Sequence, residues 1–110
     1  MIVITVRDWL ISQLELPVYG EIPADPPTEY IIVEQTGGSD INHIRGATLA
    51  IQSHAGTLLR AMEINELAKS AMDALPELPE IFSSQLNSDY NFTDTASKSY
   101  RYQAVYNVFY

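Results

Sequence analysis

An amphipathic pattern over residues 57–75 constrains the fold more than any other feature of the sequence. At about 100° per residue, its apolar side chains share one side of a helix. These are Ala61, Ile64, Leu67, Ala68, Ala71, Met72 and Leu75. Thr57 is predicted to cap this helix, and Lys69 lies at helical spacing from both Glu66 and Asp73, which predicts two ion pairs. A helix with one apolar side has to pack that side against another element.

The segment before this helix is predicted to form a β-hairpin. Residues 30–35 are β-formers, residues 36–40 are rich in turn formers, and a second strand is expected over residues 42–54. In that second strand Ala47, Leu49 and Ile51 alternate with Thr48, Ala50 and Gln52. Alternation of this kind is typical of a strand with one buried face.

A second hairpin is predicted after the helix. It comprises a strand over residues 81–92 with a bulge or kink at 87–89, a polar turn at 93–98, and a strand over 99–110. The last strand carries large side chains on both faces. We therefore expect both of its faces to be covered, either by the core or by a partner.

The chain begins with a predicted short helix over residues 5–14, capped by Thr5, with Asp8 in the first turn. Its apolar face would be Val6, Trp9, Leu10 and Leu14. Residues 17–28 contain four of the six prolines, which predicts an extended connector that is neither helix nor paired strand.

The predicted order is therefore helix, hairpin, helix, hairpin. The simplest layered solution is an α+β fold, in which a four-stranded antiparallel sheet packs two helices on one face. We expect one domain over residues 1–110, since a chain of 110 residues with 46% hydrophobic residues can bury about two-thirds of its unfolded surface.

The charge balance excludes some classes of function. Six Lys and Arg against fourteen Asp and Glu give a net charge of −8, which argues against binding duplex DNA tightly through its phosphates.

The chain has no cysteine, which excludes disulfides and thiol chemistry. We expect no membrane span and no secretory signal, so synthesis in the cytoplasm is the expectation.

Motifs for catalysis or cofactor binding are missing from the sequence. On one regular strand His43 and His54 would point to opposite faces, so we expect solvated or loop-packed histidines rather than a shared metal. The run from Asp89 has Asp94 and Tyr100 where a calcium loop needs glycine and glutamate. We therefore predict no catalytic residue, metal or cofactor. A small enzyme or ligand-binding domain stays open as an alternative, and it would need a deep pocket with convergent polar groups.

Seven aromatic residues crowd the last twenty-one positions: Tyr90, Phe92, Tyr100, Tyr102, Tyr106, Phe109 and Tyr110. Packing in the core and contact with another protein would both explain them. Base stacking in an RNA-binding sheet is disfavoured, because only Lys98 and Arg101 lie nearby.

Four segments carry a resemblance to a known family. They are AIQSHAG at 50–56, EINE at 63–66, LNSDYNFTD at 86–94 and YRYQAVY at 100–106. They resemble small tail-assembly proteins of long-tailed bacteriophages and of prophages of Gram-positive hosts. The order of the elements is similar to that of the tail terminator, or tail completion, family. The resemblance spans residues 28–110.

That family implies a structural protein that forms a hexameric ring on the finished tail tube and is monomeric in some cases when free. Its implied partners are further copies of itself, the tail tube protein and the head connector protein, with DNA passing through without being gripped. The implied location is the host cytoplasm during assembly and then the head-proximal end of the tail. Another head–tail connector, a head-completion protein or a small protein-binding module remains an alternative.

Two sets of residues are candidates for such a role. The interface candidates are Arg60, Tyr90, Phe92, Tyr102 and Tyr106. If Tyr102 and Tyr106 anchor an interface, alanine at either position should weaken assembly by about 2 kcal/mol and leave the monomer folded. Arg60 is a candidate intersubunit cation, with an ordinary solvated arginine as the alternative. The candidate channel-facing acids, which otherwise serve solubility, are Glu34, Asp40, Glu63, Glu66 and Asp73.

Overall fold

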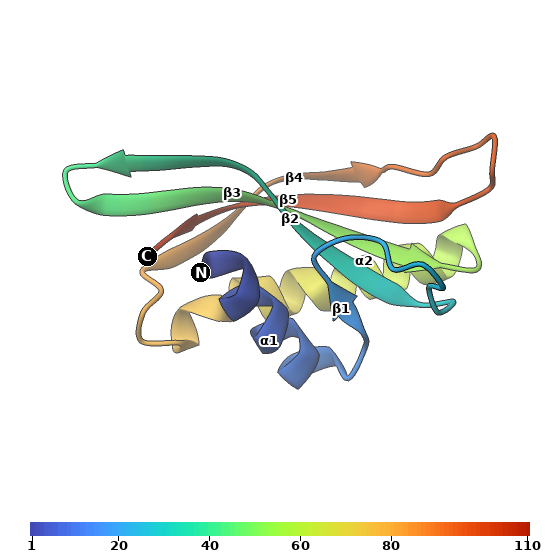
Figure 1. Cartoon of the computed structure of the whole chain (residues 1–110), viewed down its shortest axis with the longest axis horizontal. Coiled ribbons are helices and arrows are strands. Elements are labelled where there is room, and N and C mark those ends of the chain that lie inside the picture. Colours follow the sequence, from blue (N-terminus) through green and yellow to red (C-terminus); the bar gives the residue numbers. More distant parts are fainter.

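The computed structural model describes all residues, 1–110, and shows two helices packed on the same side of a five-stranded mixed sheet (Figure 1). The elements are α1 (Ile2–Leu14), β1 (Val18–Tyr19), β2 (Tyr30–Ile41), β3 (Ile44–Ala55), α2 (Leu58–Asp73), the 3-10 helix η1 (Leu75–Glu77), β4 (Ser83–Asn91) and β5 (Tyr100–Phe109). The strand order is β1-β2-β3-β5-β4. The predicted α+β class is confirmed.

The four predicted strands pair antiparallel as expected, but the sheet is not four-stranded, because a fifth strand, β1, pairs with β2 in parallel. The connector expected to lack a paired strand contains β1, where Val18 lies opposite Ile31. The Ile31 N–H donates to the carbonyl of Pro17 at 2.9 Å. Val18 and Tyr19 are β-formers that retain their own N–H groups, and Val18 is buried in the core. Burial of this one side chain draws the segment to the edge of the sheet.

The first hairpin is longer than predicted. Residues 36–40, expected to turn, continue β2, and the turn is the Asn42-His43 pair with φ angles of 53° and 65°. Two-residue turns with positive φ match the twist of the flanking strands, and asparagine tolerates this conformation. A register shift between Gln35 and Gly37 marks the start of what we call the hairpin arm, residues 37–48. Its end runs past both helices (Figure 1).

Helix α1 begins three residues earlier than predicted, and Thr5 does not cap it. Met1 occupies the N-cap position, and the Thr5 hydroxyl donates to the Met1 carbonyl at 3.2 Å from within the first turn. Ile2, Val6 and Leu10 are buried at a spacing of four residues. This stripe extends the apolar face by one turn and explains the earlier start.

Helix α2 largely follows its predicted pattern. The Thr57 hydroxyl accepts from the Arg60 N–H at 3.2 Å, which confirms the cap. The predicted apolar residues that are buried are Ala61, Ile64, Ala68, Ala71, Met72 and, in η1, Leu75. Leu67 is the exception, because 48% of it is exposed at the edge of the packed side.

The core lies between the helices and the facing side of the sheet. Its largest fully buried side chains include Tyr106, Leu49, Ile51, Ile31 and Leu10.

The bulge or kink predicted at residues 87–89 is confirmed as a register shift between Leu86 and Ser88 of β4. Neither helix has the length and apolar character needed to cross a bilayer.

Candidate functional site

The sheet face opposite the helices, which we call the open face, carries an ordered set of polar and aromatic side chains. The strand registers place them side by side on β2, β3, β5 and β4. The open face is formed by Tyr30, Ile32, Gln52, His54, Tyr90, Arg101, Gln103 and Val105. Five of these residues, Tyr30, Ile32, Gln52, His54 and Gln103, are buried, so only the part around Tyr90 and Arg101 is accessible to a partner. No helix lies over this face (Figure 1).

At the centre of the open face a histidine and two glutamines bond to one another. Gln52 Nε2 donates to Gln103 Oε1 at 3.0 Å, and His54 Nε2 lies 3.3 Å from Gln52 Oε1, a contact that the neutral Nε2–H tautomer satisfies. The His54 ring stacks on Tyr30 with centroids 4.4 Å apart. Burial, assisted by the charge of Arg101, lowers the pKa of His54 to about 4, so its ring is neutral at pH 7.

The expectation of solvated or loop-packed histidines is therefore wrong for His54. Only 3% of this residue is exposed, and it packs within the sheet. His43 lies at the exposed turn of the hairpin arm. Alternation along β3 turns the His54 ring to the same side as Gln52, where Tyr30 covers it.

Two of the predicted interface residues meet at one end of the open face. The rings of Tyr90 and Phe92 contact edge to face with centroids 6.1 Å apart, and the residues are 41% and 40% exposed. Gln103 Nε2 donates to the Tyr90 hydroxyl at 2.6 Å. The Arg101 guanidinium lies 4.8 Å from the Phe92 ring centroid, and its Nε donates to the Phe92 carbonyl at 2.7 Å. Half-exposed aromatics beside arginine are typical of protein–protein interfaces.

The other two tyrosines face the helices. Tyr106 is fully buried, and its hydroxyl donates to Asp73 Oδ1 at 2.9 Å and lies 3.1 Å from the Lys69 carbonyl. Burial, together with Asp73, raises the pKa of Tyr106. Tyr102 is half-buried on the same side. Tyr106 is therefore a core residue of the single chain, as packing in the core, one of the two explanations of the aromatic strand, predicts.

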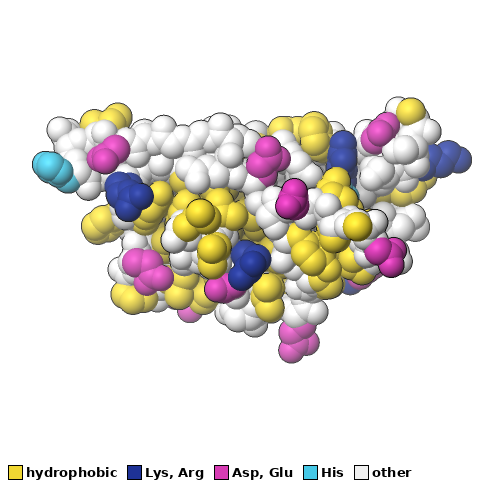
Figure 2. All heavy atoms as spheres, in the orientation of Figure 1, with side chains coloured by type: hydrophobic (Ala, Val, Ile, Leu, Met, Phe, Trp, Pro, Cys, Tyr) yellow, Lys and Arg dark blue, Asp and Glu magenta, His cyan; other side chains and the backbone are white.

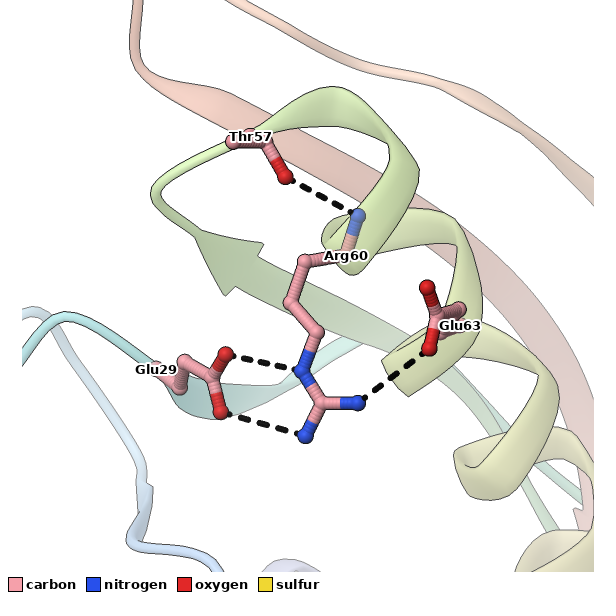
Figure 3. A network of polar contacts seen from close by, with 4 residues as sticks. All are labelled: Glu29, Thr57, Arg60 and Glu63. Atoms are coloured by element: carbon pink, nitrogen blue, oxygen red, sulfur yellow. Dashed lines mark hydrogen bonds and ion pairs between the residues drawn. The ribbon is translucent and has the colours of Figure 1, made fainter.

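Arg60 is held within its own chain (Figure 3). Its Nε and Nη2 donate to the two carboxylate oxygens of Glu29 at 2.8 and 3.2 Å, and its Nη1 lies 3.4 Å from Glu63 Oε2. The hydrogen bond from Arg60 lowers the pKa of Glu29 and raises that of Arg60. The bidentate contact joins the end of the proline-rich loop to α2. Arg60, the candidate intersubunit cation, therefore has two acidic partners within its own chain.

We expect Glu29→Gln to lower the free energy of unfolding by up to about 1 kcal/mol, because the pair is partly exposed and solvent screens it. Urea unfolding in low and high salt measures the effect, which should shrink as salt rises. Asp25→Asn, in the same loop, is the control. If Glu29→Gln and Asp25→Asn lowered the free energy of unfolding equally, the Arg60 contact would have no specific role in stability.

A second polar cluster anchors β4 to α2. Lys69 Nζ lies 2.9 Å from both Glu66 Oε1 and Asp89 Oδ2, and Asn65 Nδ2 donates to Asp89 Oδ2 at 2.9 Å. The Glu66–Lys69 pair was predicted and is confirmed, whereas the predicted Lys69–Asp73 pair is wrong. Lys69 turns toward the strand because Asp89 lies there, and its hydrogen bond lowers the pKa of Asp89.

The five candidate channel acids lie on two layers of the chain. Glu34 and Asp40 are exposed on β2, on the sheet, and the other three are exposed on α2. Of those three, Glu63 pairs with Arg60, Glu66 pairs with Lys69, and Asp73 accepts a hydrogen bond from the Tyr106 hydroxyl.

Two hollows open on the helical side of the molecule. The larger, about 350 Å³, is lined by Thr5, Asp8, Trp9, Ser12, Leu78 and Glu80. The smaller, about 240 Å³, is lined by Gln13, Leu14, Leu67, Ser70, Ala71 and Ala74. No group of three or more His, Asp or Glu side chains is arranged to hold a metal ion.

Sequence reasoning missed the centre of the open face. The sequence does show Gln52 and His54 alternating along one strand. The neighbouring strand in the sheet, however, is distant in sequence. Only the pairing of β3 with β5 brings Gln103 opposite Gln52. The exposed pair Ile41 and Ile44 at the end of the arm was missed because the turn was placed too early.

No protein-family model matches this chain, and no curated protein matches it.

Proposed function

We propose that this chain is a non-enzymatic virion-assembly protein that caps a bacteriophage tail tube as a ring. In this function, copies join head to tail, one face of the ring contacts the tube protein, and the other contacts the head connector. The hexameric stoichiometry comes from the family resemblance. The protein would act first in the host cytoplasm and then at the head-proximal end of the tail.

The observation that supports this proposal best is the hairpin arm. The arm extends a molecule measuring 44 × 25 × 24 Å past its helices (Figure 1), and it ends in Ile41 and Ile44, which are 66% and 49% exposed. An apolar projection on one side of a chain suits contact with a different patch on a neighbour. Repetition of such a contact between unlike patches builds a ring when the rotation closes.

The cluster of Tyr90, Phe92 and Arg101 supplies a further surface for a protein partner. In the proposed ring, this cluster on the open face would contact the tube protein or the head connector. The net charge of −8 suits a protein beside passing DNA, because carboxylates repel phosphate and leave the duplex free to slide.

The proposal is tested by adding the purified chain to growing tubes of the tail tube protein from the same genome. Negative-stain images should show tubes that stop growing at the length reached on addition, each with a ring at one end. Tubes that elongate as in buffer alone would overturn the proposal.

Alanine at Phe92 should weaken tube capping by about 2 kcal/mol, a roughly 30-fold rise in the concentration needed, if the cluster anchors a partner. The stability of the monomer should change little, because 40% of Phe92 is already exposed. Phe82→Ala is the matched control, since Phe82 is 78% exposed and lies outside the cluster. Equal capping by wild type and Phe92→Ala would exclude the cluster from the contact.

A further inference from the structure

Arg101 is a cation whose hydrogen-bonding capacity is only partly used within the chain. Its Nε donates to the Phe92 carbonyl at 2.7 Å, and its guanidinium carbon lies 4.8 Å from the centroid of the Phe92 ring. The two Nη groups keep all their N–H donors free of hydrogen bonds within the chain. Three other cations pair with carboxylates, and these are Arg7, Arg60 and Lys69. Arg101 forms no ion pair, so its Nη groups are free to bind an acceptor from outside the chain.

The carboxylate of Asp94 does not neutralise Arg101. Hydrogen bonds from Ser97 and from the Ala96 N–H lower the pKa of Asp94, and the charge of Arg101 adds a smaller contribution. The Ala96 N–H donates to Asp94 Oδ1 at 3.1 Å. Asp94 is therefore bound by its own turn, and it forms no ion pair with Arg101.

Tyr90 supplies a second unused donor near Arg101. Its hydroxyl oxygen accepts from Gln103 Nε2 at 2.6 Å, which leaves the Tyr90 O–H to donate to a further group. Gln103 and Arg101 lie two positions apart on the same face of β5, a spacing of about 7 Å. The half-exposed rings of Tyr90 and Phe92 lie beside these donors. Such a surface fits an extended segment that offers two acceptors and an apolar side chain.

We infer that the cluster of Tyr90, Phe92 and Arg101 binds an acidic segment of a partner protein, in which a carboxylate contacts the two Nη groups of Arg101. A main-chain carbonyl of the same segment accepts from the Tyr90 hydroxyl, and an apolar side chain packs on the exposed rings. This inference rests on the proposed function, because it names the chemistry of the protein that the cluster contacts in the ring. Arginine binds a carboxylate through two parallel hydrogen bonds, as Arg60 binds Glu29 within this chain.

The surroundings of the cluster favour a single carboxylate over the repeated phosphates of a nucleic acid. Within residues 83–109, Lys98 is the only cation besides Arg101. Figure 2 shows acidic side chains spread over the visible face of the molecule, with fewer basic ones among them. A nucleic acid would bring many negative charges against such a surface, whereas one carboxylate needs only one cation. The acidic surface also repels an acidic segment at other positions, so Arg101 selects where it binds.

Two peptides that differ in one side chain test this inference. They are acetyl-Gly-Glu-Leu-Gly-amide and acetyl-Gly-Gln-Leu-Gly-amide, each titrated into the isotope-labelled full chain. The signals of the Arg101 Nε–H and the Gln103 side-chain amide are followed by NMR. The glutamate peptide should bind about fivefold more tightly than the glutamine peptide, the effect of one exposed ion pair. This preference should shrink as salt rises.

Substitutions at Arg101 should change the preference in a graded way. Arg101→Gln should abolish it, as followed by the Gln103 signal. Arg101→Lys keeps the charge and loses the paired Nη donors, so the preference should fall to about twofold. Arg7→Gln is the matched control, because it also removes one positive charge but lies on α1, on the opposite side of the sheet from the cluster (Figure 1). The control should keep the full preference, and the dispersion of the amide signals shows that each variant is folded.

Two results of the titration would overturn the inference. One is equal binding of the two peptides by the wild-type chain. The other is a short thymidine strand that moves the same signals at a lower concentration than the glutamate peptide, since the site would then prefer phosphate.

Tube capping separates this inference from the proposed function. Tubes capped by a chain that shows no preference for the glutamate peptide refute the acidic segment and leave the ring function standing. A clear preference in a chain whose addition leaves the tubes elongating supports the acidic segment and overturns the ring function.

Discussion

Replacing Tyr106 with alanine should lower the free energy of unfolding by about 3 to 5 kcal/mol, the cost of removing a buried aromatic ring. Tyr106 is the largest fully buried side chain, and it packs beneath α2 in the middle of β5. For a domain of this size the loss is a large part of the total stability. Urea unfolding followed by circular dichroism measures it.

This result would replace the expectation that alanine at Tyr106 leaves the monomer folded. The hydroxyl is tested separately with Tyr106→Phe, which keeps the ring and loses the bond to Asp73. We expect Tyr106→Phe to lower the free energy of unfolding by about 1 kcal/mol. The loss is small because Asp73 is exposed, so water can donate the hydrogen bond that the hydroxyl donated. Wild-type stability in Tyr106→Ala would contradict the core assignment and return this tyrosine to the interface.

Lowering the pH from 7 to 5 should cost about 2 kcal/mol of stability through His54 alone. Its pKa is lowered from 6.5 to about 4 in the folded chain, so between these values the unfolded chain binds more protons than the folded chain. The free energy of unfolding therefore falls as the pH falls through this window. Urea unfolding at half-unit pH steps measures the slope.

The variant His54→Phe isolates this effect. Phenylalanine can retain the stack on Tyr30 and cannot titrate, so most of the pH dependence between 7 and 5 should disappear. His43→Gln changes the other histidine, at the exposed turn, and should keep the full dependence. An unchanged slope in His54→Phe would show that the pH dependence comes from other groups.

Helix α2 was predictable because its pattern is local. Thr57, the apolar positions and the breaking prolines all lie within about twenty residues, and each acts through neighbours three or four positions away. Leu67 departs from the pattern because the width of the buried stripe depends on where α1 crosses, which the helix's own sequence does not contain. The loss of the predicted Lys69–Asp73 pair has the same origin, since Asp89 approaches from a distant strand.

The first hairpin shows the limit of turn signals. Gly37 and Gly38 are compatible with a turn and also with a strand, and the choice depends on which register buries Val33, Leu49 and Ile51 together. That register moves the turn to Asn42 and His43. The hairpin arm and its exposed isoleucines are consequences of this shift.

By itself the sequence determined the α+β class, the capped amphipathic helix and the two hairpins, because periodicity and capping act over a few residues. Only the tertiary structure decided that β1 joins the sheet, that Tyr106 lies in the core while Tyr90 and Phe92 stay exposed, and that Arg60 binds Glu29. The physical reason is that burial and pairing depend on residues far apart in sequence. Both faces of β5 carry large side chains, and only the packing of α2 distinguishes the core face from the face left for a partner.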